Sequence, residues 1–129
     1  METEIFTVCD FAQDNNGKLT IVGTFDRITP PAFPHVHPTF SIAVRLRFSQ
    51  KELGSHKFQL KLNAPDESQL LPIVEGDIQV NKNPETDYTA INFAVNLNQV
   101  RFEKPGKYTI ELFMDEEWIS GLTLTLSNR

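Results

Sequence analysis

Apolar and polar residues alternate at every second position along most of this chain. The clearest segment runs from residue 40 to residue 49, where the apolar set is Phe40, Ile42, Val44, Leu46 and Phe48. A period of two places successive side chains on opposite faces, as in a strand with one buried face. The segment therefore predicts a half-buried β-strand, with the apolar set in the core.

The same alternation recurs to the end of the chain. Further strands are predicted near residues 57–62, 70–80, 91–97, 108–114 and 122–126. Pro72 and Gly76 interrupt the second of these, which favours an edge strand or a bulged one. The pattern predicts a core of Phe40, Ile42, Val44, Leu46, Phe58, Leu60, Leu62, Phe93, Val95, Ile110, Leu112 and Leu124. No segment shows the periodicity of a helix of useful length.

The chain opens with a predicted hairpin of Ile5–Ala12 and Leu19–Ile28, closed at Asn16-Gly17. Asn-Gly is a strong type I′ turn signal, because both central residues need a positive φ. Gly23 indicates a bulge or a close backbone approach within the second strand. The first strand is apolar on both faces, so we expect it to be covered by Thr29–Pro38 or by a second subunit.

Eight strands without helical crossovers predict one all-β domain over residues 1–129. We expect a single antiparallel β-sandwich of about eight strands, of the jelly-roll or C2-like type. A closed barrel would give the same alternation, so the choice between sandwich and barrel stays open at this stage.

The composition of the chain excludes some classes of binding partner and indicates its compartment. The net charge of −5 argues against nucleic acid and against an anionic membrane as partners. The single cysteine, Cys9, cannot form an internal disulfide, and the acidic start shows no signal peptide, so we expect a cytoplasmic protein. Cys9 lies in an apolar strand and is expected to be a small buried residue.

Four cations form the strongest candidate surface. Arg45 and Arg47 share the outer face of one predicted strand, and Lys57 and Lys61 share that of the next. If the two strands pair as a hairpin, the four side chains form a basic patch for an acidic partner or an anion. The alternative is that these charges only protect an edge from aggregation.

His35 and His37 are weak candidates for a metal site. In an extended chain their Cα atoms lie roughly 6–7 Å apart on one side. A metal would need at least one further protein ligand, and no second motif supplies it, so we assign no metal and no cofactor.

Two groups of carboxylates could gather at the loops and resemble a calcium site: Asp10, Asp14 and Asp26 in the first hairpin, and Asp115, Glu116 and Glu117 in the last turn. Their spacing matches no calcium-binding loop. Trp118, next to the second group, is either a stacking platform for a sugar or peptide, or a core residue.

No catalytic motif is present, so we expect a protein that is not an enzyme. The leading hypothesis is an interaction or accessory module with a protein-binding surface, whose partner is another protein or a second copy. The alternative is a ligand-binding module for a carbohydrate, an anion or a metal at the loop ends. A hydrolase is the least supported class.

The residues Cys9-Asp10-Phe11-Ala12-Gln13, followed by Gly17-Lys18-Leu19, Ile21 and Gly23, carry a resemblance. They resemble the start of a family of uncharacterised bacterial proteins, classed as a domain of unknown function, with the pattern Cys/Ala-Asp-x-Ala-Gln and then Gly-Lys-Leu-x-Ile-x-Gly. The resemblance implies a compact β-sandwich of bacterial or phage-associated origin and transfers no activity. Later, Pro105-Gly106-x-Tyr108 is typical of a strand start whose tyrosine hydroxyl ties a loop.

Overall fold

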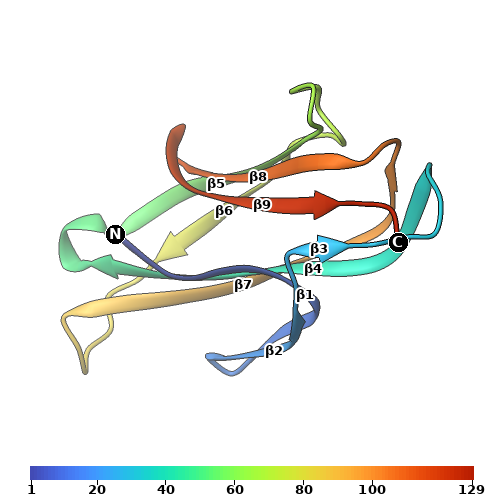
Figure 1. Cartoon of the computed structure of the whole chain (residues 1–129). Helices are drawn as coiled ribbons and strands as arrows, with labels where there is room; N and C mark the ends of the chain where they lie inside the picture. Colours follow the sequence, from blue (N-terminus) through green and yellow to red (C-terminus); the bar gives the residue numbers. More distant parts are fainter.

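A computed structural model describes all 129 residues, and the chain forms nine strands in two sheets (Figure 1). The four-stranded sheet has the order β2 (Lys18–Thr24), β1 (Glu2–Asn15), β4 (His35–Ser49) and β7 (Tyr88–Phe102). The five-stranded sheet has the order β3 (Arg27–Ile28), β9 (Glu117–Leu126), β8 (Gly106–Met114), β5 (Gly54–Asn63) and β6 (Val74–Val80). The all-β class is confirmed. One pairing, β3 with β9, is parallel, so the sheets are not wholly antiparallel as predicted.

The hydrophobic core lies between the two sheets, as one contiguous cluster of 20 buried residues. Nine of the twelve predicted core residues are buried. Phe58, Phe93 and Val95 are only half-buried, because β7 is an edge strand and β5 lies next to the edge strand β6. The rings of Phe58 and Phe93 stack 4.5 Å apart and join the two sheets at this open side. The edge position predicted for the strand near residues 70–80 is confirmed for β6.

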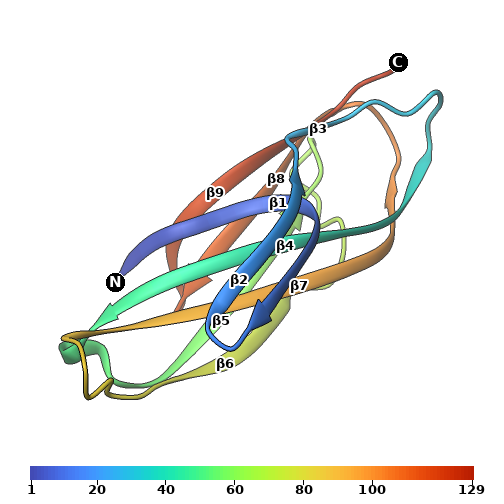
Figure 2. The same cartoon turned by 90° about the horizontal axis from the view of Figure 1, so that it is seen from below.

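The first hairpin folds over the outer face of its own sheet (Figures 1 and 2). The first part of β1 pairs with β4, and from Cys9 onward β1 pairs with β2. Cys9 and Ala12 are buried against Ala43 of β4 in a small second cluster. The cover of the first strand is therefore intramolecular, but it is the hairpin itself and not Thr29–Pro38 as predicted.

The turn of this hairpin has the predicted geometry. Asn16 and Gly17 have φ values of 51° and 85°. Gly23 has a φ of 67°, and the carboxylate of Asp10 lies directly over it, where a Cβ would overlap Asp10 Oδ2. The chain turns away after Gly23, so the predicted strand Leu19–Ile28 is in fact two strands, β2 and β3, in different sheets.

The connection between β4 and β5 crosses from one sheet to the other. The short 3₁₀ helix η1 (Gln50–Glu52) begins at a capping box, in which Ser49 accepts a hydrogen bond from Lys51 N and Glu52 accepts one from Ser49 N. The prediction that these two strands pair as a hairpin is therefore wrong.

Candidate functional site

The four cations predicted to form one surface are divided between the two sheets. Arg45 and Arg47 lie on β4, and Lys57 and Lys61 lie on β5. Lys57 Nζ lies 3.3 Å from Glu75 Oε2, and Lys61 Nζ lies 4.3 Å from the centre of the Phe113 ring. The predicted basic patch across paired strands does not form, because its two strands have other partners.

Arg45 belongs to a polar network that fixes the hairpin. Its Nε donates to Glu4 Oε1 at 2.9 Å, and its Nη1 donates to Asn92 Oδ1 at 3.0 Å. The amide of Asn92 in turn donates to Asp14 Oδ1 and to the Gly17 carbonyl, each at 3.0 Å. This chain of hydrogen bonds ties the hairpin turn to β7, so Arg45 has a structural partner inside the protein.

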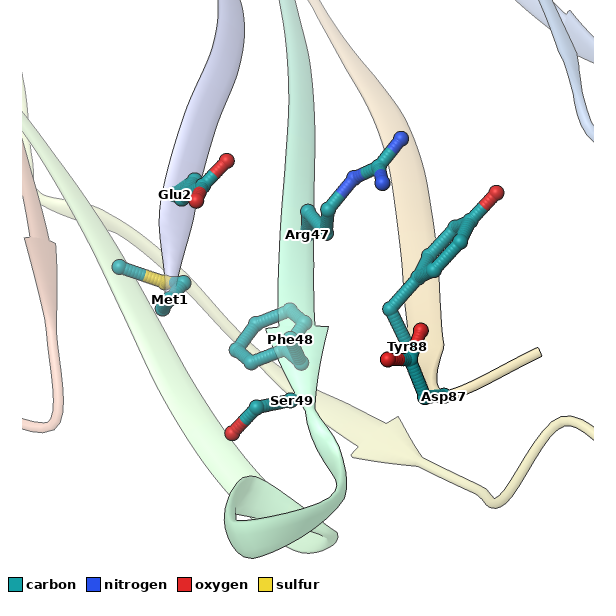
Figure 3. A pocket seen from close by; sticks show the side chains of 7 residues that line it. All are labelled: Met1, Glu2, Arg47, Phe48, Ser49, Asp87 and Tyr88. Carbon is teal, nitrogen blue, oxygen red and sulfur yellow. The ribbon is translucent and has the colours of Figure 1, made fainter.

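Arg47 lies beside a pocket of about 230 Å³ at the end of β1, β4 and β7 (Figure 3). Its guanidinium carbon is 3.8 Å from the centre of the Tyr88 ring, a cation–π contact. Its Nε lies 3.0 Å from Glu4 Oε2, but the N–H is not aligned with that oxygen and has no hydrogen-bond partner. Glu2 and Asp87 also line the pocket, so it does not concentrate positive charge.

A second pocket, of about 250 Å³, lies where β2 gives way to β3. Its polar walls are Asp10, Thr24, Arg27 and His37, and Phe25 adds an aromatic ring. Asp10 and Arg27 form no ion pair with each other or with any other side chain. The pocket therefore offers a carboxylate, a guanidinium and an imidazole to a polar ligand.

His35 and His37 project to the same side of β4, as predicted. They hydrogen-bond to each other, with 3.1 Å between His35 Nε2 and His37 Nδ1. Burial lowers the pKa of His37, and the charge of His35 lowers it further, against the opposing effect of Asp10. No three His, Cys, Asp or Glu side chains of the chain lie close enough together to hold a metal ion.

One carboxylate of the last turn, that of Asp115, is paired with His56. Asp115 Oδ2 lies 2.6 Å from His56 Nδ1, and Asp115 Oδ1 accepts a hydrogen bond from Lys57 N at 2.9 Å. His56 Nε2 lies 2.6 Å from the Glu52 carbonyl oxygen. Both partners of the ring are acceptors, so both ring nitrogens must carry a proton. This imidazolium links η1 to the β8–β9 turn.

Trp118 and Cys9 have contrasting surroundings. Trp118 is 58% exposed, lies over Gly121 and donates a hydrogen bond from its indole N–H to Glu111 Oε2. It is therefore a surface residue and not part of the core. Cys9 is fully buried, as predicted, and burial raises the pKa of its thiol.

The open edge of β7 was not predicted from the sequence. Only β4 pairs with β7, so the other edge of this 15-residue strand offers free backbone N–H and C=O groups (Figure 2). The thirteen residues from Tyr88 to Val100 include no charge, no proline and no glycine. The signal that could have revealed this edge is the absence of charge between Asp87 and Arg101.

The hairpin adds a small exposed apolar patch. Phe11 and Val22 are directly opposite each other across β1 and β2, and they are 46% and 52% exposed. Ala12 and Ile21, one position further on, face the sheet. The outward face of the hairpin is thus available for contact.

No helix of the chain is long and apolar enough to cross a membrane. No curated protein and no solved structure shows significant similarity to this chain. The sequence model of one protein family matches residues 4–127. The chain therefore belongs to this family, the Family of unknown function (DUF6941).

Proposed function

We propose that this protein is a non-enzymatic interaction module whose protein-binding surface is the open edge of β7. The observation that supports this proposal is the long run of uncharged residues on an unpaired strand. A partner in extended conformation would add one strand to the four-stranded sheet, with backbone hydrogen bonds supplying affinity and side chains supplying selectivity.

The other sheet edges carry the features that normally prevent such pairing. β6 has Glu75 and Asp77, β3 has two residues, and β2 begins with Lys18. Charged side chains and short strands are the usual protection of an exposed edge. β7 has neither, so its edge is the one best suited to bind a strand.

The side chains of β7 add an apolar contribution. Ile91, Phe93 and Val95 face the core but stay half-exposed at the open side of the molecule. A strand paired with β7 would cover these side chains as well as the backbone groups. Burial of apolar area contributes about 25 cal/mol per Å² to such an association, before the cost of ordering the partner.

A labelled peptide with the sequence of residues 87–101 tests strand addition. We expect it to bind the wild-type protein, and to bind Asn98→Lys more weakly, because a lysine on the edge disfavours strand pairing. Gln13→Lys is the matched control, since both residues are exposed amides and Gln13 lies in the hairpin. Equal binding to all three proteins would contradict the use of this edge.

The second candidate is a ligand-binding module. It is favoured by the pocket in which Asp10 and Arg27 stay unpaired beside His37. A carbohydrate or an anion suits these groups better than a metal. Titration with inorganic phosphate and with neutral sugars, followed by amide NMR shifts at Thr24 and His37, would detect such a ligand. Shifts confined to residues outside the pocket would exclude it.

We further propose that the two sheets form a β-sandwich of the jelly-roll or C2-like type, and that the protein acts in a bacterial cytoplasm. The shared core between the sheets supports the sandwich, although the five-stranded sheet curls into half a barrel. The lack of any disulfide requirement is compatible with a reducing compartment.

A further inference from the structure

We propose that the pocket where β2 gives way to β3 binds a free α-amino acid, with Asp10 holding its ammonium group and Arg27 holding its carboxylate. This inference rests on the second candidate function, the ligand-binding module, and is independent of the edge of β7. It names the class of ligand, which is a small molecule that carries both a positive and a negative charge.

The two charges of the pocket are both available to a ligand. Asp10 of β1 and Arg27 of β3 line one pocket of about 250 Å³, and both side chains are exposed. Neither side chain forms an ion pair within the chain. In contrast, Arg45, Arg47 and Arg101 each lie beside a glutamate. Arg27 therefore differs from these arginines in having no acidic partner.

The presence of both signs of charge selects the ligand. A simple anion would be attracted by Arg27 but repelled by Asp10, and a simple amine would meet the reverse. A neutral sugar would hydrogen-bond to both groups without compensating either charge. An α-amino acid carries an ammonium group and a carboxylate on one carbon, so it can give each side chain an opposite charge and a charge-assisted hydrogen bond.

Gly23 allows the position of Asp10. The φ of Gly23 is 67°, and Asp10 Oδ2 occupies the space that a Cβ of residue 23 would need. The carboxylate therefore lies over bare backbone at the wall of the pocket, where only glycine leaves room for it.

His37 and Phe25 complete the walls of the pocket. His37 Nδ1 lies 3.1 Å from His35 Nε2, and His37 Nε2 has no partner within the chain. Burial, and then the charge of His35, lower the pKa of His37, so the ring is neutral at about pH 7 and adds no third charge. The Phe25 ring is half-buried, 6.3 Å from the His37 ring, and offers apolar surface to the side chain of the amino acid.

The size of the pocket favours a small amino acid. Pockets for drug-sized ligands have volumes of about 300–1,000 Å³, whereas this pocket has about 250 Å³. A short side chain such as that of alanine suits this volume. The charged walls are exposed, so salt screens them, and we expect millimolar affinity that weakens as the ionic strength rises.

Amide NMR titration of the full chain with L-alanine and two analogues tests the inference. Propionate is alanine without the ammonium group, and ethylamine is alanine without the carboxylate. We expect L-alanine to give saturable shifts at Thr24 and His37, and to bind about tenfold more tightly than either analogue. The three ligands are compared at one ionic strength and at about pH 7, where the ring of His37 is neutral.

Variants that remove one charge test each contact separately. Asp10→Asn should weaken the binding of L-alanine about tenfold but strengthen that of propionate, because the repulsion of its carboxylate is lost. Arg27→Gln should weaken the binding of L-alanine but strengthen that of ethylamine, for the corresponding reason. A change that only disturbs the fold would weaken all three ligands. Asp77→Asn, an exposed change on β6, is the matched control and should have no effect. Circular dichroism checks that each variant folds.

The outcomes separate this inference from the proposed functions. Binding of L-alanine that is no tighter than that of its two analogues would overturn the inference. Saturable binding of glucose or phosphate in the pocket without binding of L-alanine would also overturn it, and would leave a ligand-binding module in place. Absence of pocket shifts with all these compounds would overturn both the inference and the second candidate function. Strand addition at β7 has its own test, the peptide of residues 87–101.

Discussion

The stability of this protein should depend on pH through His56, and the change to test is His56→Gln. The ring nitrogens of His56 lie 2.6 Å from Asp115 Oδ2 and 2.6 Å from the Glu52 carbonyl oxygen, so the folded state holds the imidazolium. The hydrogen bond to Asp115, and then the one to Glu52, raise the pKa of His56. Glutamine removes the charge and the titration while retaining a polar side chain.

The magnitude follows from the two hydrogen bonds. A hydrogen bond to a charged group contributes about 1.5–3 kcal/mol when it is shielded from water. The His56 side chain is 16% exposed, but that of Asp115 is 50% exposed, so solvent screens the pair. We therefore expect both bonds together to contribute about 1–2 kcal/mol.

The sign of the pH dependence follows from linkage. Because the folded pKa of His56 lies above the unfolded value of about 6.5, the contribution is complete below that pH and is lost as the pH rises through the folded pKa. The pKa of His37 is lowered, so its contribution is present above the unfolded value and is lost as the pH falls through the folded one. Both proteins contain His37, so its effect cancels in their difference.

Urea unfolding of wild type and His56→Gln at several pH values measures this difference. We expect wild type to be about 1–2 kcal/mol more stable at about pH 5.5, and the two proteins to converge in alkaline solution. Asp115→Asn should reduce the pH dependence, because it removes the main cause of the raised pKa. A difference that is constant with pH, or that grows as pH rises, would refute the imidazolium.

Three further changes test the fold and the hairpin. Leu60→Ala should lower the free energy of unfolding by about 2–5 kcal/mol, since Leu60 is fully buried, and an unchanged urea midpoint would contradict its place in the core. Gly23→Ala should lower the melting temperature, because the φ of residue 23 is positive and the new Cβ would meet Asp10. Adding Asp10→Ala should recover only part of this loss. Full recovery would mean that the positive φ causes no strain. Asn92→Ala should increase hydrogen exchange in the hairpin turn, because its hydrogen bonds tie the turn to β7; unchanged exchange would show that apolar packing alone holds the hairpin.

The sequence alone determined the features that arise from neighbouring residues. Alternation with a period of two identified the strand at Phe40–Phe48 and its buried face, because the pleat of a strand fixes that period. Asn16-Gly17 identified the first turn, because few residues adopt a positive φ at low cost. Tyr108 donates its hydroxyl to the Lys104 carbonyl, as its local pattern predicted.

Only the tertiary structure decided which strands are neighbours. Alternation does not indicate which strands pair with each other. Arg45 and Lys57 were therefore expected on one surface, but they lie in different sheets. The Ser49 and Glu52 capping box begins a short helical turn at this crossover, but as a sequence pattern it is a weak signal beside a strong alternation and was not predicted. The open edge of β7 depends on which backbone groups stay unpaired. The cover provided by the hairpin depends on apolar faces that are far apart in the sequence and are brought together by folding. Such contacts are set by the competition among all strands for partners, which no local pattern records.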